Sequence, residues 1–343
     1  MKAAVAPAPP ATWPARLRYG LMRRQPVLLS LAMLGLSLPL WQARVRPPLA
    51  AWLMDLAVHW QWPYLMLGTL AVSLWLALAP HDERRHMWPL PLLFAALAAL
   101  TMGVAVLPRL PAMPADGGPA AEAASIKVVS FNVQIDNASH AAILDWVDAA
   151  RPDVLALLEV TPAMAPLVDA LATRFPQALS RPRDDPFGLA VFSRHPWQDA
   201  RVETPEGGTP AFWARLQAPG GDIGLHVIHP MPPVSAADRA TRDALFARLA
   251  AVPQDGLPRV LMGDFNATPW SAGLRRLGEG GWARANGLRP TFALGRSLPI
   301  DHILATPAHW RRGDTGLGPW LGSDHRPVWA RLHRVSTPPA NPQ

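Results

Sequence analysis

Three long apolar segments without a charged residue follow one another in the first third of the chain. They are Pro26–Trp41, Trp62–Pro80 and Trp88–Leu107, with 16, 19 and 20 residues. A helix needs about 20 apolar residues to cross a bilayer, so the second and third fit well and the first is marginal. A buried core helix or, for the first segment, a signal peptide would give a similar pattern. Three such segments in succession favour a three-helix membrane anchor over residues 26–107 instead.

Basic residues flank these segments unequally, and this asymmetry sets the orientation of membrane helices. Seven lie before the first segment or between the second and third, namely Lys2, Arg16, Arg18, Arg23, Arg24, Arg84 and Arg85. Three lie on the other side, namely Arg44, Arg46 and Arg109. We therefore predict that residues 1–25 are a basic cytoplasmic tail and that the chain after Leu107 lies outside the cytoplasm.

Two further segments complete the predicted organisation around the anchor. Leu49–Trp60 is apolar but carries Asp55 and His59, which predicts an interfacial helix or an extension of the second span. Residues 108–124 are rich in proline and alanine and contain two adjacent glycines, a composition typical of a semi-rigid linker. The proline-rich residues 336–343 are predicted to be a disordered tail.

From Ile126 the pattern changes to short apolar or β-branched runs that alternate with amphipathic segments and turns. Eight runs are predicted strands: Ile126–Asn132, Asp153–Glu159, Gly188–Ser193, Phe212–Gln217, Asp222–His229, Arg259–Asp264, Ile300–Ala305 and Pro327–Leu332. Four segments are predicted helices: Ser139–Ala150, Pro162–Arg174, Ser235–Ala251 and Ser271–Leu277. This content predicts an α/β fold over residues 125–335, with two packed sheets covered by helices.

The polar residues that stand out in this region lie at strand ends. Four close a predicted strand, one opens a strand and two directly precede one: Asn132, Glu159, His229, Asp264, Asp301, and Asp324 with His325. We expect them to share one acidic cleft at a rim of the sheets. The chain has no cysteine, which excludes thiolate zinc sites, iron–sulfur clusters and cysteine nucleophiles. Carboxylates, amides and histidines suit a hard divalent cation such as Mg²⁺ or Mn²⁺.

An Asn or Asp at a strand end is most often a turn or capping residue, so single residues such as Asn132 are weak signals. The motifs Gly263–Asn266 and Ser323–Val328 are more specific, because each gathers several polar groups beside a strand. Asp301 and His302 are neighbours in a predicted strand and must point to opposite faces. We assign Asp301 to the cleft.

Six motifs occur in an order that resembles the endonuclease/exonuclease/phosphatase superfamily. They are Ser-Phe-Asn-Val at 130–133, the run 152–160 ending in Glu-Val, His-Pro-Met-Pro-Pro at 229–233, the run 263–271 that starts Gly-Asp-Phe-Asn, Ile-Asp-His-Ile-Leu at 300–304 and Gly-Ser-Asp-His-Arg-Pro-Val at 322–328. The match spans roughly Ile126 to Arg334. The His-Pro-x-Pro-Pro form and the three-span anchor resemble the small membrane-tethered bacterial branch, which implies a multi-pass protein of the bacterial inner membrane.

The resemblance implies a four-layer α/β/β/α sandwich and Mg²⁺-dependent hydrolysis of phosphoester bonds. It assigns Glu159 as the principal metal ligand, with Asn132 and Asp324 nearby. A bound divalent cation would neutralise charge on the phosphate oxygens.

The remaining site residues take roles in the reaction by the same resemblance. Asp264 would orient or deprotonate the attacking water, and Asn266 would hold the phosphate. Asp301 would orient His325, which would contact the scissile phosphate or act as a base. His229 lies where the family has either a second histidine of the cleft or a tyrosine.

Three functions are compatible with this pattern. The first is a membrane-tethered, metal-dependent phosphoesterase, the second an exported endonuclease or exonuclease, and the third an inactive binding domain on a membrane anchor. Retention of all the motif residues speaks against the third. Residues 125–343 carry 22 basic and 20 acidic residues, which is little excess charge for a domain that grips duplex DNA. The sequence therefore favours a lipid-linked phosphate over nucleic acid as substrate.

Overall fold

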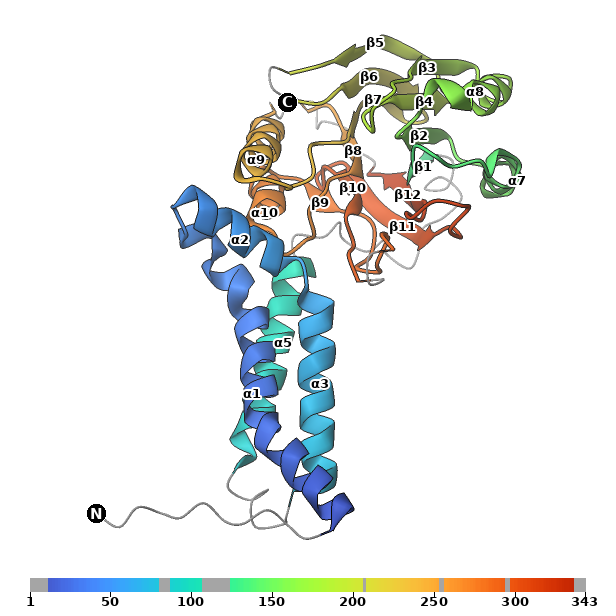
Figure 1. The fold of residues 1–343 in the computed structure, drawn as a ribbon. Coiled ribbons are helices and arrows are strands. Elements are labelled where there is room, and N and C mark those ends of the chain that lie inside the picture. Colours follow the sequence, from blue (N-terminus) through green and yellow to red (C-terminus); the bar gives the residue numbers. More distant parts are fainter. Residues whose placement is uncertain are drawn as a thin grey trace, which may run out of the picture.

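The computed structural model describes residues 12–79, 87–106, 124–205, 208–252, 256–293 and 297–335. Within these residues, a bundle of helices from the first third of the chain carries an α/β domain at one of its ends (Figure 1). The bundle contains three long helices, α1 (Trp13–Trp41), α3 (Gln61–Leu78) and α5 (Pro89–Val106). The short helix α2 (Pro48–Val58) lies at the end nearest the α/β domain (Figure 1).

Close helix contacts hold the bundle together where glycines face aromatic rings. A Cβ atom added to Gly35 of α1 would lie 2.4 Å from the ring of Tyr64 on α3. One added to Gly68 of α3 would lie 2.1 Å from the ring of Phe94 on α5. Small residues at helix interfaces allow this close approach. The outward surface carries exposed apolar side chains, such as Leu34 and Met66.

Two of the bundle helices are long and apolar enough to cross a membrane, Tyr19–Arg44 and Gln61–Leu78. The third, Pro89–Ala105, is apolar but shorter, so the expectation of three spanning helices is met for two by length and composition. The segment Leu49–Trp60 forms a separate helix, α2, and the chain turns at His59 and Trp60 before α3 begins. It is therefore not an extension of the second span.

Parts of the predicted organisation fall outside the described residues. These are residues 1–11 of the predicted tail, residues 108–123 of the predicted linker and the predicted tail 336–343. Helix α1 begins at Trp13, so part of the segment predicted as a cytoplasmic tail is helical.

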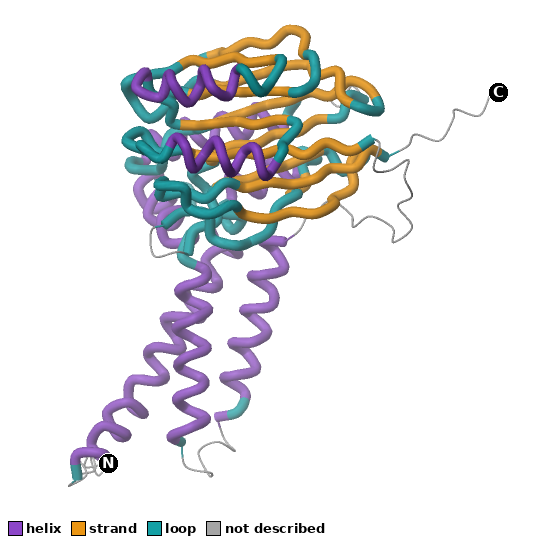
Figure 2. The backbone as a smooth tube through the Cα atoms, turned by 90° about the vertical axis from the view of Figure 1, so that its right-hand side faces the viewer, coloured by secondary structure: helices purple, strands orange, loops and turns teal. Residues whose placement is uncertain are grey.

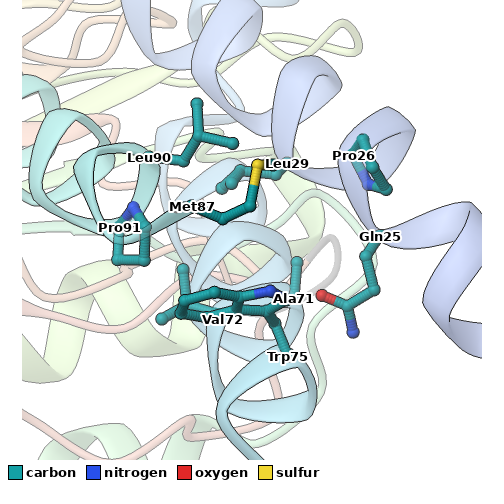
Figure 3. Close-up of a pocket in the computed structure, with 9 residues that line it drawn as sticks. All are labelled: Gln25, Pro26, Leu29, Ala71, Val72, Trp75, Met87, Leu90 and Pro91. Carbon is teal, nitrogen blue, oxygen red and sulfur yellow. The ribbon is translucent and has the colours of Figure 1, made fainter. Parts of the chain in front are cut away.

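A small cavity of about 30 Å³ lies between α1, α3 and α5, in the half of the bundle remote from the α/β domain (Figure 3). Gln25, Trp75 and Met87 are among the residues that border it. The Gln25 amide nitrogen is buried and has no hydrogen-bond partner within the described part of the chain.

The α/β domain consists of two six-stranded mixed sheets. The first has the order β11-β12-β1-β2-β4-β3 and the second the order β5-β6-β7-β8-β10-β9. The strands of the first sheet are β1 (Ser125–Asn132), β2 (Val154–Leu158), β3 (Gln177–Arg181), β4 (Leu189–Ser193), β11 (Trp310–Leu317) and β12 (Val328–Arg334). Those of the second sheet are β5 (Trp197–Glu203), β6 (Ala211–Ala218), β7 (Gly221–Ile228), β8 (Arg259–Asp264), β9 (Ala283–Arg284) and β10 (Asp301–Ala305).

Each sheet packs against the other on one face and against helices on its other face (Figure 2). The core between the sheets includes Val128 and Val154 from the first sheet and Leu225 and Val260 from the second. The helices α7 (His140–Ala150) and α8 (Ala165–Ala172), with the short 3₁₀ turn η2 (Pro162–Met164), cover the first sheet. The helices α9 (Ala236–Ala250) and α10 (Ala272–Glu279) cover the second. The predicted pair of packed sheets flanked by helices is confirmed.

Candidate active site

Strand pairing brings the predicted site residues to one rim of the sandwich. Asn132 ends β1 and pairs with the last residue of the parallel strand β2, so Glu159 follows beside it. Ile228 at the end of β7 pairs with Gly263 of the parallel strand β8, so His229 and Asp264 are neighbours. Asp301 lies opposite Asp264 in the antiparallel pair β8–β10.

One carboxylate oxygen, Asp264 Oδ2, lies at the centre of this rim. Asn132 Nδ2 donates a hydrogen bond to it across the two sheets at 3.2 Å. His229 Nε2 lies 3.6 Å away and His325 Nε2 lies 3.7 Å away. All four side chains are almost completely buried. The structure therefore brings together residues from β1, β8, the loop after β7 and the turn before β12, as the sequence predicts.

Asp301 and His325 form the closest ion pair described in the site. Asp301 Oδ2 and His325 Nδ1 are 2.9 Å apart, and both side chains are buried. Burial alone would lower the pKa of His325, but the negative charges of Asp301 and Asp264 outweigh it and raise this pKa to about 10. A protonated His325 donates hydrogen bonds from both ring nitrogens. This state favours contact with a phosphate oxygen over proton abstraction.

Glu159 lies at the edge of the site and has a left-handed backbone conformation, which residues other than glycine rarely adopt. Its φ is 63°, and the residue is half-buried. Its Oε1 accepts a hydrogen bond from Asn132 Nδ2 at 2.8 Å, and its Oε2 accepts one from the Ile135 backbone at 3.2 Å. Burial raises the pKa of the Glu159 carboxyl, and the charge of Asp264 adds to this effect. Such strained residues with raised carboxyl pKa values concentrate at functional sites.

Asn266 lies two residues after Asp264, also with a positive φ of 47°. Its backbone N–H donates to Asp264 Oδ1 at 2.8 Å, and its side-chain amide donates to the Pro230 carbonyl at 3.0 Å. Burial, followed by the charge of Asp301, raises the pKa of Asp264. A raised pKa makes Asp264 a stronger base towards a bound water.

Asp324 is half-buried and directly precedes His325. Its negative charge is one of the smaller effects that raise the pKa of His325. Its backbone N–H donates to Gln134 Oε1 at 3.0 Å, which ties this turn to the end of β1.

The residues of the site fit a divalent cation. Asp264, Asp301 and His325 have ligand atoms within 4.8 Å of one another and could hold a metal ion. The carboxylate Glu159 is bridged to Asp264 by the Asn132 amide. After the hydrogen bond from Asn132, the effects that lower the pKa of Glu159 come from two histidines, His229 and His325. Oxygen-rich, negatively charged sites of this kind suit Mg²⁺ or Mn²⁺.

Several residues that support the site were not predicted from the sequence. Ser323 Oγ donates to the Asn132 carbonyl at 2.8 Å and accepts from the His325 N–H at 2.9 Å. Asn137 donates to the carbonyls of Val133 and Leu321. The Phe292 ring packs on His325 at 4.7 Å between centroids. Ser323 stands inside a recognised motif and could have been found there, whereas Asn137 and Phe292 carry no such signal.

The histidines that alternate with site residues point away from the cleft, as strand geometry predicts. His302 Nε2 lies 2.9 Å from the Ala267 carbonyl and the ring packs against Phe265. His226 packs against the rings of Trp213 and Trp282. The assignment of Asp301 rather than His302 to the cleft agrees with this geometry.

Comparison with solved structures shows that the fold of the α/β domain is similar to that of known proteins. The structure of an endonuclease/exonuclease/phosphatase from Beutenbergia cavernae is similar with a TM-score of 0.52 and 22% identity, over 63% of this chain and 73% of that chain. One from Bacteroides vulgatus has a TM-score of 0.51 and 18% identity, over 62% and 99%. The 3′ phosphatase NExo from Neisseria, bound to a product DNA hairpin, has a TM-score of 0.50 and 17% identity, over 60% and 98%. A search of curated proteins found no match.

Comparison of the sequence with family models adds a similarity in sequence to this similarity in fold. The model described as the endonuclease/exonuclease/phosphatase family matches residues 129–325. This range contains every residue of the rim, from Asn132 to His325, and covers more than half of the chain. The chain therefore belongs to the endonuclease/exonuclease/phosphatase family.

Proposed function

We propose that this protein is a membrane-anchored, divalent-metal-dependent phosphoesterase that acts outside the cytoplasm on a lipid-linked phosphate. Members of its family are typically metal-dependent phosphoester hydrolases. The observation that carries the proposal is the convergence of Asn132, His229 and His325 on Asp264 Oδ2, beside Glu159. This arrangement offers a base, phosphate-binding donors and a metal site within one buried rim.

Glu159 is the principal metal ligand in this proposal, with Asn132 and Asp324 beside it. Asp264, Asp301 and His325 are an alternative set of metal ligands. In that set His325 Nδ1 and Asp301 Oδ2 already hydrogen-bond to each other at 2.9 Å, which leaves fewer free ligand atoms. Glu159 is half-buried and keeps one lone pair on each oxygen beyond its two hydrogen bonds. The bound ion would supply positive charge to the phosphate oxygens.

The remaining roles in the reaction are assigned to side chains of the protein itself. Asp264, with its raised pKa, orients the attacking water and takes its proton. Protonated His325, held by Asp301, donates a hydrogen bond to the phosphate. His229 and Asn266 add donors on the other side of Asp264. Donors placed in advance where charge develops are a main source of rate enhancement.

An apolar cavity between the bundle and the α/β domain supports a lipid-linked substrate. It has a volume of about 760 Å³ and is lined mostly by apolar residues, with one charged side chain, Arg289. The other lining residues are Trp62, Pro63 and Met66 of α3, and Leu288, Pro290 and Ser297. The same segment of the α/β domain continues to Phe292, which packs on His325. A hydrocarbon chain in this cavity would enter from the membrane side of α3 and leave its phosphate near the rim.

The membrane location is supported by the shape and surface of the bundle. Helix α1 ends, α3 begins and α5 ends at the end of the bundle that carries the α/β domain (Figure 1). An odd number of crossings would place that domain opposite the N-terminus. Exposed apolar side chains on the outside of the bundle, including Leu34, Leu70 and Leu92, provide a lipid-facing surface.

Nucleic acid is the alternative substrate, because NExo of similar fold was solved with a product DNA hairpin. A hydrolysis panel separates the two. The full chain, in detergent micelles, is assayed with Mg²⁺ or a chelator on single-stranded DNA, duplex DNA, phospholipid, isoprenoid diphosphate and simple phosphomonoesters. The proposal expects metal-dependent hydrolysis with the highest kcat/KM on a lipid phosphate. Faster cleavage of DNA at matched metal and salt would overturn the lipid substrate and retain the reaction type.

Two matched variants on α3 test the cavity. Met66→Gln places a polar group in the cavity lining, whereas Leu70→Gln makes the same change one turn along, at an exposed position outside that lining. We expect Met66→Gln to raise KM about fivefold for long-chain lipid phosphates, equivalent to ~1 kcal/mol of lost apolar contact, and to leave short-chain analogues unchanged. Equal effects of the two variants would mean that the cavity does not hold the chain.

Glu159→Gln tests the metal assignment in the same assay. The neutral amide is nearly isosteric but a far poorer ligand for a hard cation. We expect a loss of about two to three orders of magnitude in metal-dependent turnover. Melting temperature in chelator should be no lower than that of the wild type, because the raised pKa of Glu159 shows that its charge is unfavourable there. A near wild-type rate would remove Glu159 from the site.

A further inference from the structure

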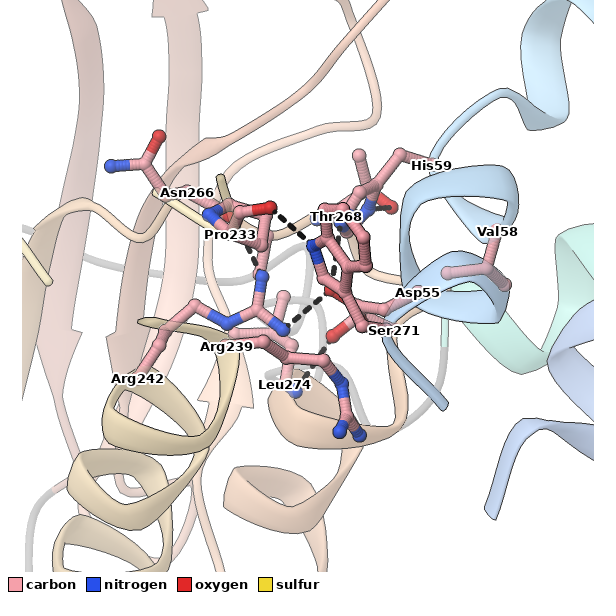
Figure 4. A network of polar contacts seen from close by, with 12 residues as sticks. Asp55, Val58, His59, Pro233, Arg239, Arg242, Asn266, Thr268, Ser271 and Leu274 are labelled. Carbon is pink, nitrogen blue, oxygen red and sulfur yellow. Dashed lines mark hydrogen bonds and ion pairs between the residues drawn. The ribbon is translucent and has the colours of Figure 1, made fainter. Parts of the chain in front are cut away.

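A buried ion pair joins the helical anchor to the α/β domain. Asp55 of α2 and Arg242 of α9 are both fully buried, and Arg242 Nη2 donates to Asp55 Oδ2 at 2.8 Å (Figure 4). Gln42 donates to the second Asp55 oxygen at 2.8 Å. Burial alone would raise the pKa of Asp55, but His59 and Arg242 hold it well below its ordinary value, so the pair is ionised. Buried charges are retained only with such partners.

The same guanidinium reaches the catalytic rim. Arg242 Nη1 donates to the backbone carbonyl of Asn266 at 2.8 Å. Asn266 is two residues after Asp264 and has a positive φ. One planar fork therefore binds the anchor with one nitrogen and the active-site segment with the other, a geometry that a lysine ammonium cannot reproduce.

Two further contacts fix the segment Phe265–Ser271, here called the catalytic loop. His59 Nδ1 accepts a hydrogen bond from the Thr268 backbone N–H at 3.3 Å and lies 2.9 Å from its hydroxyl (Figure 4). The fully buried Trp270 packs against Val58 at the end of α2 and against Trp62 of α3. Just beyond the loop, the Ala272 N–H donates to Gln42 Oε1 at 2.7 Å.

One side of the catalytic loop therefore contacts the α/β domain, and the other side contacts the helices of the anchor. On the inner side, Asn266 bonds to Asp264 and to Pro230. On the outer side, its contacts come from Asp55 through Arg242, and from His59 directly. A left-handed conformation such as that of Asn266 costs free energy and persists where its surroundings hold it.

We infer that Asp55 and His59 are positioning residues, and that the anchor holds the catalytic loop in its active geometry as well as holding the domain at the membrane. The effect on turnover rests on the proposed phosphoesterase function, whereas the effect on loop geometry does not. A displacement of about 1 Å at a reacting group can cost up to about a hundredfold in rate, so loop positioning has a measurable consequence.

The test uses the full chain with both charges of the pair removed. Asp55→Leu alone would leave the buried Arg242 with Asp243 as its one remaining ion-pair partner among the described residues, and the loss of a buried charge partner is strongly destabilising. The double variant Asp55→Leu/Arg242→Leu replaces the pair by apolar side chains, a change that is often neutral or stabilising, and removes the donor to Asn266. The control is Trp52→Phe, which removes another hydrogen bond of α2, to the Pro233 carbonyl, outside the loop.

Two measurements decide the outcome on folded protein, as judged by its melting temperature. We expect the double variant to lower kcat by at least about tenfold with KM within about twofold of wild type, whereas Trp52→Phe retains kcat. Hydrogen exchange at the amides of Phe265–Ser271 should accelerate in the double variant and not in the control. Unchanged exchange and kcat would overturn the inference. If the wild type hydrolyses no phosphoester, the exchange result alone decides, and the proposed function fails separately.

Discussion

Asp264 shows how neighbours from separate elements define the chemistry of one side chain. Its Oδ1 accepts from the Asn266 backbone, while its Oδ2 meets Asn132, His229 and His325. Burial raises its pKa, and the positive character of the histidines works against that rise. The residue is thereby kept both basic and fixed in orientation, which is what the activation of a water molecule requires.

Asp301→Asn tests whether the Asp301–His325 pair sets the orientation of the histidine. An amide that presents its NH₂ group to His325 Nδ1 would favour the other tautomer, and it would remove the charge that raises the pKa of His325. We expect kcat to fall by about 10- to 100-fold with little change in KM, as measured by steady-state kinetics. A large rise in KM at unchanged kcat would contradict an orienting role.

His226 makes stability depend on pH. Burial, with smaller effects of Arg259 and Arg201, lowers the pKa of His226 from 6.5 to about 3. Between these values the unfolded chain takes up a proton that the folded chain does not, so the free energy of unfolding falls as pH falls. We expect His226→Phe to reduce the slope of unfolding free energy against pH between about pH 6 and 4. The slope should not vanish, because burial also lowers the pKa of His302 to about 3.

Urea titrations of the wild type and the variant at several pH values provide the measurement. One proton contributes at most about 1.4 kcal/mol per pH unit, which sets the size of the change to look for. An identical slope in the two proteins would mean that His226 is protonated in the folded state or already neutral in the unfolded one.

Sequence motifs were sufficient to predict which residues gather at the site, but not what surrounds them. Asn132, Asp264 and Asp301 were recognisable because each lies at an end of an apolar strand. Asn137 and Phe292 act through contacts with the backbone or the ring of a residue far along the chain. Such contacts leave no local pattern, because any polar or aromatic residue in a loop looks the same in the sequence.

At the element scale, whether a strand could be predicted from the sequence depends on how much of it is buried. The strands β3, β5, β9 and β11 were not predicted, and each lies at an edge of its sheet. An edge strand such as β11 has few buried residues, whereas β2 and β4 are buried throughout. Apolar runs mark strands that are covered on both faces, so the interior of each sheet was predicted and its edges were not.

Gly263 allows β7 and β8 to approach closely where the site begins. Its φ is 150°, and an added Cβ would lie 1.9 Å from the Ile228 carbonyl oxygen. We expect Gly263→Ala to force the two strands apart, to lower the melting temperature by several degrees and to reduce kcat, because His229 and Asp264 follow directly. Thermal unfolding and kinetics on the purified variant would show this.

Gly287→Ala is the matched control for this prediction. Gly287 lies in the same domain, and the nearest atom to an added Cβ is 4.0 Å away. It should retain both the melting temperature and kcat. If Gly263→Ala behaved like this control, the two strands would tolerate the extra atom and the close approach would not matter.

At the scale of the whole molecule, the helical bundle and the α/β domain form one packed unit over the described residues. The Pro- and Ala-rich residues 108–124 predicted a domain on a linker. Asp55 and Arg242 are 187 positions apart, and nothing local in the sequence links them. Asp55 and His59 were recognised only as interruptions of an apolar segment. Arg284 and Arg275 also donate to the carbonyls of Ala105 and Pro39 in the bundle. These contacts are tertiary, and a sequence without a structure cannot pair them.

The orientation of the whole chain in the membrane is the remaining prediction. Seven basic residues flank the bundle on the N-terminal side and three on the other, and short basic loops stay in the cytoplasm. Alkaline phosphatase fused after Leu107 should therefore be active, since this reporter folds only outside the cytoplasm, and the same reporter at Arg84–Arg85 should be inactive. A fluorescent reporter that folds only in the cytoplasm should give the opposite pair of results. The reverse pattern for both reporters would put the catalytic rim inside the cell, where nucleic acid would become the better substrate candidate and the cavity beside Trp62 would open towards the inner leaflet.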